Sequence, residues 1–344
     1  NMIKDLLQEA FALKASGHYK HAIEVFYKAL ELDNTSSELL LEIADLYNKL
    51  GNEEKALNYI EQILNSEPTH VEALKFLKRV FEKKCAWLEA EQTAKNIYCV
   101  SHNPSDLAEI FKLLIKQNKF DEIFKFNQKS DDKNVCLEIA RAYYYKKDFG
   151  HALELLEKIQ PQMAENQDYL LLLGECYYYL NKKERCIDII AKFSAKNAEQ
   201  LNFIGLVETY LENYKSAIRY FNDAIKQNRS NSEYYYNLAN VYFKLGEFSL
   251  AKRNYNLAIS IEPENKNYHF ALANLYYSEK HYKKALEELQ GNFFEARFLK
   301  AVILYETGYL ALARRELNEL AEEFPEKSMV AEYKAKIDSE LGLS

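Results

Sequence analysis

The side chains that most often carry out chemistry are few in this sequence and poorly grouped. His18 and His21 lie three residues apart, a spacing that puts two imidazoles on one face of a helix, where they could share a metal ion. No further ligand stands close to them in the sequence, so we expect two exposed histidines beside a turn. The acidic pair Asp131–Asp132 is expected in a solvated turn for the same reason.

The cysteines and the short catalytic motifs point away from an enzyme. The five cysteines form no C-x-x-C pair, and their odd number does not suit a disulfide framework; they are Cys85, Cys99, Cys136, Cys176 and Cys186. A reducing compartment is the simpler interpretation. The sequence also contains no G-x-x-x-x-G-K-[ST], H-E-x-x-H or G-x-S-x-G. We therefore expect no catalytic activity, no cofactor and no metal.

Charge and hydropathy exclude further classes of protein. The net charge of −7 gives no general attraction to nucleic acid or to an anionic membrane, although KFLKRVFEKK is locally basic. No apolar run approaches the roughly 20 residues that span a bilayer. The first residues, NMIKDLLQEAFAL, do not resemble a signal peptide. We expect a cytoplasmic protein, or a periplasmic one if a signal peptide is missing from this sequence.

A set of mostly small residues recurs along the chain, and it marks the structural elements that position the other side chains. The set begins at Ala22 in HYKHAIEVF, where alanine follows tyrosine by three residues. Its other members are Ala56, Ala90, Ile123, Ala152, Cys186, Ala217, Ala251, Ala285 and Ala313. Five of the nine successive gaps are 34 residues, which indicates an internal repeat.

A second set of small residues lies twelve residues before the first. Its members are Ala10, Ala44, Lys78, Phe111, Ala140, Gly174, Gly205, Ala239, Ala273 and Ala301, of which eight are alanine or glycine. Two helices approach closely only where the residue at their crossing is small. The paired sets therefore predict tightly packed helical hairpins.

Glycines and prolines mark the expected turns. Gly17, Gly51 and Gly246 lie between the two predicted helices of their hairpins and suit a left-handed helix C-cap. All five prolines are expected at the end of a second helix, and none is expected to interrupt a helix; they are Pro68, Pro104, Pro161, Pro263 and Pro325.

These residues resemble the tetratricopeptide repeat, a helix–turn–helix unit of about 34 residues with small residues at its eighth and twentieth positions and proline near its thirty-second. The best copies are residues 232–265 and 37–70, and the resemblance covers about 3–325. It implies an all-α, right-handed superhelix, or solenoid, of about ten hairpins. The stripe Val330, Tyr333, Ile337 and Leu341 predicts a final capping helix.

The quality of the repeats suggests four segments. Residues 1–103 hold three repeats, 135–325 hold repeats five to ten, and 326–344 form the cap. Residues 104–134 form a degenerate repeat, because Phe111 and Ile123 replace its small residues and its second helix runs into NQKSDDKN. We expect looser packing and a hinge there.

Two tyrosine triplets occupy equivalent places, Tyr143–Tyr145 and Tyr177–Tyr179. A helix buries about one face, so the three rings of a triplet cannot all be core. We expect the first tyrosine of each triplet to pack inside its hairpin. The resemblance implies that first helices line the inside of the superhelix. It therefore places the second and third tyrosines of each triplet on that concave side.

The same implication gives a set of candidate residues for binding a partner in a concave groove. They are Arg141, Tyr144, Tyr145, Tyr178, Tyr179, Tyr236, Asn240, Phe243, Phe270, Asn274 and Tyr277. Tyrosine suits protein binding because its ring is large and amphipathic. Some members of the family hold a partner's terminal carboxylates with asparagines in successive repeats, but Ala271 stands where the second one belongs, so that clamp is absent.

The expected function is therefore a non-catalytic scaffold that holds a peptide segment or helix of a partner protein. The alternative is an accessory or assembly subunit of a larger complex in the cell envelope, in secretion or in motility, which would use the convex face or the ends. The excess of acidic residues argues against RNA as the partner.

Overall fold

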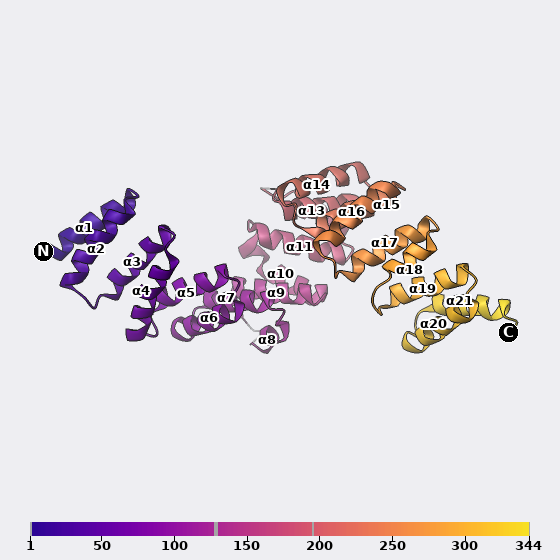
Figure 1. Cartoon of the computed structure of the whole chain (residues 1–344), viewed down its shortest axis with the longest axis horizontal. Helices are drawn as coiled ribbons and strands as arrows, with labels where there is room; N and C mark the ends of the chain where they lie inside the picture. Colours follow the sequence, from indigo (N-terminus) through magenta and orange to yellow (C-terminus); the bar gives the residue numbers. More distant parts are fainter. Residues whose placement is uncertain (1, 127–129, 195, 344) are drawn as a thin grey trace. The chain divides into compact units, whose positions relative to one another are not determined.

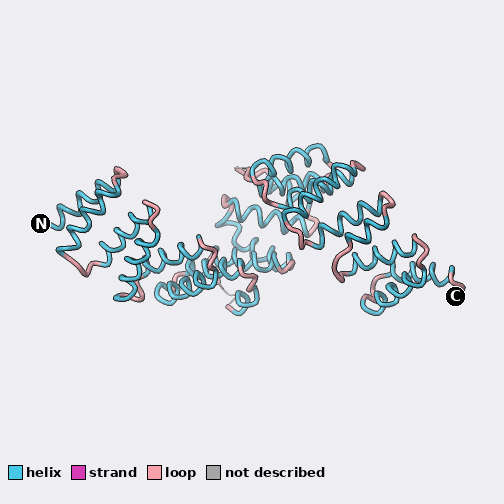
Figure 2. Tube along the Cα trace, viewed as in Figure 1, coloured by secondary structure: helices cyan, strands magenta, loops and turns pink. Residues whose placement is uncertain are grey.

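The backbone of the protein is built from helices and turns. The computed structural model describes residues 2–126, 130–194 and 196–343, and within these ranges it contains no strand (Figures 1 and 2). The predicted all-α class is confirmed. Contacts along the chain divide it into two compact units, unit 1 (Asn1–Leu180) and unit 2 (Asn181–Ser344).

In its described residues, unit 1 contains five helical hairpins and one further helix. Its first helices are α1 (Met2–Ala15), α3 (Ser37–Lys49), α5 (Val71–Lys83), α7 (Pro104–Lys116), α9 (Lys133–Tyr145) and α11 (Gln167–Tyr179). Its second helices are α2 (Tyr19–Leu32), α4 (Glu53–Ser66), α6 (Trp87–Ser101), α8 (Phe120–Lys125) and α10 (Phe149–Met163).

The described part of unit 2 begins with a second helix, α12 (Lys183–Ile190), and continues with four hairpins. The first helices are α13 (Ala198–Tyr210), α15 (Ser232–Lys244), α17 (Lys266–Ser278) and α19 (Phe294–Glu306). Their partners are α14 (Tyr214–Gln227), α16 (Phe248–Ile261), α18 (Tyr282–Glu288) and α20 (Leu310–Glu323), and α21 (Ser328–Glu340) closes the chain.

The small residues lie where the two helices of a hairpin cross. Ala239 and Ala251, from α15 and α16, are both fully buried. The closest approach is at Gly205 of α13, where a methyl group added to the backbone would lie 2.6 Å from the Phe221 ring of α14. The small residue on the first helix therefore leaves room for a large side chain on the second helix, sixteen residues later in the sequence. These two residues pack against each other in the core of the hairpin.

Each hairpin turn holds one residue with positive φ. The predicted glycines Gly17, Gly51 and Gly246 are among them, at +79°, +78° and +76°. Equivalent turns use non-glycine residues, namely Cys85, Asn118, Lys147, Asn181, Glu212 and Lys280. The chain needs this left-handed conformation to leave the first helix, whichever residue stands there. For a non-glycine residue the conformation costs about 1–2 kcal/mol, and packing of the two helices outweighs that cost.

The expectation that no proline interrupts a helix is wrong at Pro161, which lies inside α10. Only the last turn of the helix follows the proline, so a single backbone hydrogen bond is lost. Met163, the final residue of α10, is 4% exposed, and its packing holds this turn in helical form. Pro104 is the first residue of α7, where its missing N–H has no helical partner to lose.

The degenerate repeat keeps a packed first helix but a very short second one. Phe111 and Ile123 are fully buried in one apolar cluster, so this hairpin accommodates large residues at both crossing positions. Helix α8 spans six residues, and residues 127–129 lie outside the described ranges. The hinge and the division into four segments stay predictions.

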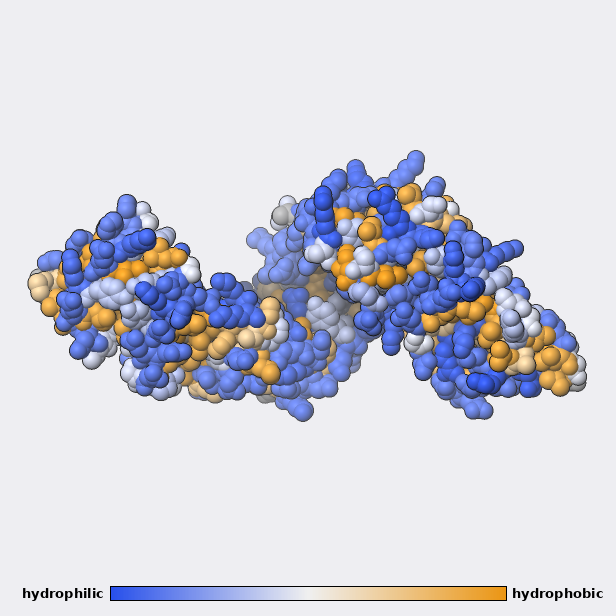
Figure 3. Space-filling model, viewed as in Figure 1, coloured by the Kyte–Doolittle hydropathy of each residue, from blue (hydrophilic) through white to orange (hydrophobic). Residues whose placement is uncertain are grey.

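The final helix covers the last hairpin. Val330 and Ile337 of α21 are buried against α19 and α20 in a cluster that includes Tyr333. Leu341 follows the end of α21 and is 39% exposed, so it does not join the predicted stripe. The surface shown in Figure 3 is mostly hydrophilic, with hydrophobic groups between the charged ones.

Candidate partner-binding face

The first helices of neighbouring hairpins lie beside one another within each unit. Helix α9 contacts α7 and α11 in unit 1, and α13 contacts α15 in unit 2. Side-chain caps fix where several of these helices begin: Asp132 accepts the N–H groups of Asn134 and Val135, and Asn197 forms a capping box with Gln200. The register of the exposed side chains follows from these starts. We call this surface the first-helix face.

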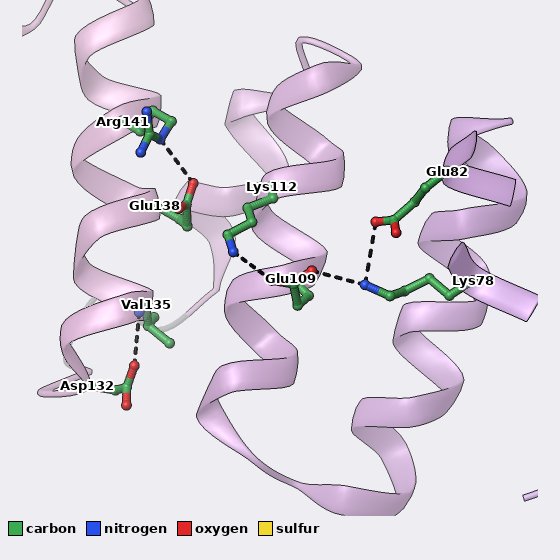
Figure 4. A network of polar contacts seen from close by, with 8 residues as sticks. All are labelled: Lys78, Glu82, Glu109, Lys112, Asp132, Val135, Glu138 and Arg141. Carbon is green, nitrogen blue, oxygen red and sulfur yellow. Dashed lines mark hydrogen bonds and ion pairs between the residues drawn. The ribbon is translucent and has the colours of Figure 1, made fainter. Parts of the chain in front are cut away.

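In unit 1 the first-helix face carries ion pairs that link successive hairpins (Figure 4). The Lys78 ammonium of α5 lies 3.0 Å from the Glu109 carboxylate of α7 and 3.4 Å from Glu82. On the other side of Glu109, Lys112 lies 2.6 Å away. Of these pairs, Lys78–Glu109 crosses between α5 and α7, so it joins one hairpin to the next.

The next helix, α9, adds a buried acidic group to this face. The Glu138 side chain is 4% exposed, and the Nε of Arg141 lies 3.3 Å from it. Burial raises the pKa of Glu138, although Arg141 and Lys112 act in the opposite direction. For Glu109, burial is outweighed by the hydrogen bonds from Lys112 and Lys78, and its pKa is lowered. Spacing along the sequence gave no sign of Lys78–Glu109, the pair that joins two helices.

The first tyrosine of each triplet packs inward, but against the preceding hairpin and not only inside its own hairpin, where the sequence places it. Tyr177 is 4% exposed, and its O–H donates to Glu157 of α10 over 3.2 Å. The Tyr143 ring lies 4.5 Å from the Phe124 ring, between centroids. Both residues therefore contact the second helix of the preceding hairpin.

The third tyrosine of each triplet stacks on the preceding hairpin. The Tyr179 ring lies 4.5 Å from Phe149 with an interplanar angle of 9°, and the Tyr145 ring lies 6.0 Å from Phe120. Tyr145 and Tyr179 are 52% and 47% exposed, so about half of each side chain is accessible to solvent. Both rings stand at the turn end of their helices.

The residues at these two positions are also in contact in other hairpins, although their side chains differ. We call this contact the edge contact. It joins the last residue of a first helix to the first residue of the preceding second helix. Lysine lies over an aromatic ring in Lys49–Tyr19, at 5.6 Å, and in Lys116–Trp87, at 4.3 Å. In Lys183–Tyr210 the two partners are reversed, also at 4.3 Å. Lys83–Glu53 is an ion pair at 3.3 Å.

The edge contact predicts which substitutions of Tyr179 are tolerated. Tyr179→Ala removes the ring stack and should lower the free energy of unfolding by about 0.5–1.5 kcal/mol. Tyr179→Lys should recover much of this loss, because an ammonium over Phe149 recreates the contact of Lys116 with Trp87. Urea unfolding of the three proteins measures the difference. Equal losses for alanine and lysine would contradict the assignment.

In unit 2 the candidate residues contact their own hairpin and the next one. The Tyr236 ring lies 6.0 Å from that of Tyr255 in its own hairpin and 4.9 Å from that of Tyr268 in the next. The Asn240 Oδ1 accepts a hydrogen bond from the O–H of the buried Tyr255 over 2.7 Å. This bond fixes the orientation of the Asn240 amide. Burial raises the pKa of Tyr255, so this hydroxyl keeps its proton.

The remaining candidates are half-buried beside other aromatic rings. Phe243 lies 5.7 Å from Phe248, Phe270 lies 5.5 Å from Phe293 and Tyr277 lies 6.0 Å from Tyr282, all between ring centroids. Arg141, Tyr144, Tyr178 and Asn274 are half-buried as well. The candidate side chains are thus held by neighbours and keep part of their surface exposed.

One polar contact on this face was missed by the sequence. The Asn237 Nδ2 donates to the Asn202 Oδ1 over 3.0 Å and links α15 to α13. The two asparagines are 35 residues apart, one more than the repeat length, so a search at a fixed interval does not align them. A comparison of neighbouring positions in successive repeats could have found the pair.

Two segments match the sequence model of the tetratricopeptide repeat, residues 13–82 and 232–265. The first helices, second helices and small crossing residues of these segments have the geometry described above. The chain therefore contains tetratricopeptide repeats. The predicted solenoid of helical hairpins is thereby confirmed.

Two curated relatives match parts of this tetratricopeptide repeat protein. Tetratricopeptide repeat protein 14 of Mus musculus is 30% identical over 114 residues, which are 33% of the chain and 15% of that protein. Photosystem I assembly protein Ycf3 of Prochlorococcus marinus is 30% identical over 80 residues, which are 22% of the chain and 46% of that protein. The chain therefore spans less than half of either relative.

A solved structure with the same fold is the APC/C hetero-tetramer Cut9–Hcn1. It covers 95% of this chain and 74% of its own, with a TM-score of 0.61 and 12% identity. At that identity the likeness concerns the fold alone.

Two further findings describe this repeat protein. In the described ranges, no three His, Cys, Asp or Glu side chains are grouped so that they could hold a metal ion. No helix of those ranges combines the length and the apolar character needed to cross a bilayer.

Proposed function

We propose that this protein is a non-catalytic scaffold that binds a segment or helix of a partner protein along its first-helix face. The residues proposed to contact the partner are Arg141, Tyr144, Tyr145, Tyr178, Tyr179, Tyr236, Asn240, Phe243, Phe270, Asn274 and Tyr277. The partner is a protein, with no nucleic acid and no inserted membrane segment involved.

The observation that carries this proposal is the half-exposed aromatic surface repeated on successive first helices. Tyr145 and Tyr179 are 52% and 47% exposed, while Phe120 and Phe149 stack on their rings and hold them in place. Rings fixed in this way lose little conformational freedom on binding, so more of the contact energy is kept as affinity. The neighbouring charged groups add selectivity for the partner's own charges.

Alanine substitution of three first-helix tyrosines tests the proposal. The triple variant of Tyr144, Tyr178 and Tyr236 should lose most partner binding in affinity purification, at least tenfold, because each ring contributes buried area to the contact. Partners are identified by mass spectrometry and then measured with purified components. Circular dichroism should show the same helicity in both proteins.

Tyr309→Ala is the matched control. Tyr309 is 61% exposed and caps α20, a second helix, so it lies off the first-helix face. This variant should bind like the natural protein. Full binding by the triple variant, or an equal loss in both variants, would count against the first-helix face.

A second candidate function is that of an accessory or assembly subunit of a larger complex, acting through the convex face or the ends. It is supported by the relative whose name describes assembly of photosystem I, which shares 30% identity over 80 residues. If partners are retained by the triple tyrosine variant and lost when exposed side chains of second helices are changed, this second candidate is favoured.

A further inference from the structure

The outward side of α14 in unit 2 carries a stripe of cations. Lys215, Arg219 and Lys226 are all exposed, and their spacing of four and then seven residues puts them on one side of the helix. Lys226 lies 2.7 Å from Asp223, the single acidic residue of α14. Among the described residues, no carboxylate forms an ion pair with Lys215 or Arg219. The stripe therefore leaves positive charge uncompensated at the surface.

This charge departs from the pattern of most other second helices. Arg219 stands two residues after the small residue Ala217, and the same position is acidic in α2, α10, α12 and α18, where it holds Glu24, Glu154, Asp188 and Glu287. In α20 it holds Arg315, which lies 3.6 Å from Glu319. In α16 it holds Arg253, which is exposed, and α16 contains no acidic residue. Two successive second helices of unit 2 therefore present an arginine at the same place.

Exposed apolar side chains of α16 lie beside these cations. Leu250, Leu257 and Ile261 are 40%, 39% and 36% exposed. The Lys252 ammonium lies 5.0 Å from the Tyr276 ring of α17, so its side of α16 faces the following hairpin. The three apolar residues lie roughly 140–200° around the helix from Lys252, on the side toward α14. Figure 3 shows hydrophobic groups among hydrophilic ones in this part of unit 2.

We propose that the outer surface of α14 and α16, which we call the outer basic face, docks an acidic segment of a partner protein that also carries apolar side chains. The carboxylates of the segment meet Lys215, Arg219 and Arg253, and its apolar side chains cover Leu250 and Leu257. An arginine can hold a carboxylate through two parallel N–H donors. This surface belongs to second helices, so the inference goes beyond the first-helix face and gives the scaffold a second contact.

The ends of the outer basic face favour a short protein segment over a longer polyanion. Glu212 and Glu247 precede the two helices, and Glu262 and Glu264 follow α16. The basic stretch between them is about 20 Å long, the length of the 14-residue helix α14. A nucleic acid or an anionic membrane extends its charge beyond that length and meets these carboxylates. A short acidic segment stays near the cations, and screening over about 8 Å weakens the effect of more distant acids.

The test measures binding of a fluorescein-labelled peptide of leucine and glutamate, arranged as an amphipathic helix of about four turns, to the full chain. Fluorescence anisotropy should show binding that weakens as salt is added. A matched peptide with lysine in place of glutamate should not bind, and one with serine in place of leucine should bind several-fold more weakly. Equal binding of the glutamate and lysine peptides would overturn the proposal, as would tighter binding of a labelled single-stranded RNA or of phosphatidylglycerol vesicles.

Charge reversal on the outer basic face locates the contact. Arg219→Glu combined with Arg253→Glu should bind the glutamate peptide at least tenfold more weakly at unchanged helicity, because α2 already has glutamate at this position. Lys20→Glu is the matched control, since Lys20 is exposed on α2 at the position equivalent to Lys215, and it should bind the peptide normally. Equal binding by all three proteins, or an equal loss in both variants, would overturn the proposal. Tyr178→Ala should bind the peptide normally, so failure of the outer basic face and failure of the first-helix face are distinguishable.

Discussion

Gly205→Ala should lower the free energy of unfolding of unit 2 by about 2 kcal/mol. The added methyl carbon would lie 2.6 Å from Cε1 of Phe221, and that ring is fully buried. The ring has no free volume to move into, so α13 and α14 must separate or the ring must leave its preferred rotamer. Urea unfolding, together with amide exchange in the two helices, measures the loss.

Two further variants decide whether the contact with Phe221 is the cause. Gly150 lies in the first turn of α10, where an added methyl group meets only Asp148 at 3.9 Å. Gly150→Ala should therefore stabilise the protein by up to about 1 kcal/mol through helix propensity. Phe221→Leu should be less damaging in the Gly205→Ala protein than alone. A loss at Gly205 that Phe221→Leu does not alter would reject the explanation.

Glu91→Gln should lower the free energy of unfolding of unit 1 by about 2–3 kcal/mol at neutral pH. Glu91 of α6 is buried, and its carboxylate accepts from Lys95, Gln117 and Lys119 over 2.5, 2.8 and 2.9 Å. Burial acts to raise the pKa of Glu91, but these donors prevail and hold it at about 2. This group ties α6 to the residues that precede the short helix α8.

The pH dependence of this loss provides its own check. Because the pKa of Glu91 is lower in the folded chain, its stabilising effect is complete above its ordinary value of about 4.5. It disappears as the pH falls from there toward 2, so natural protein and variant should converge in stability over that range. Glu61→Gln, at an exposed position of α4, should show no such convergence. A constant difference across the range would exclude Glu91 as the titrating group.

The crossings of the hairpins could be predicted from sequence because they depend on one local requirement. Only a very small side chain lets two helices come as close as α13 and α14 do, and such residues leave a clear interval in the chain. The inward position of Tyr177 followed from the same interval, since its place is three residues after Gly174. Here the composition of a few positions decides the packing.

Other features escaped because they depend on pairs of positions in different elements. Pro161 stays within α10 because burial of Met163 outweighs the tendency of proline to end a helix. A rule based on the proline alone does not include this burial. The ion pairs of Glu109 require knowing which helices are neighbours.

The edge contact bears on how such an array can change over generations. At one junction a lysine faces a ring, at the next two rings stack, and at another the ring and the cation have traded places. One amino-acid replacement at a time can pass between these versions without leaving a bare interface. A hairpin can therefore be duplicated, lost or moved along the chain and still contact a compatible neighbour. The number of repeats can change while the contacts between hairpins are kept.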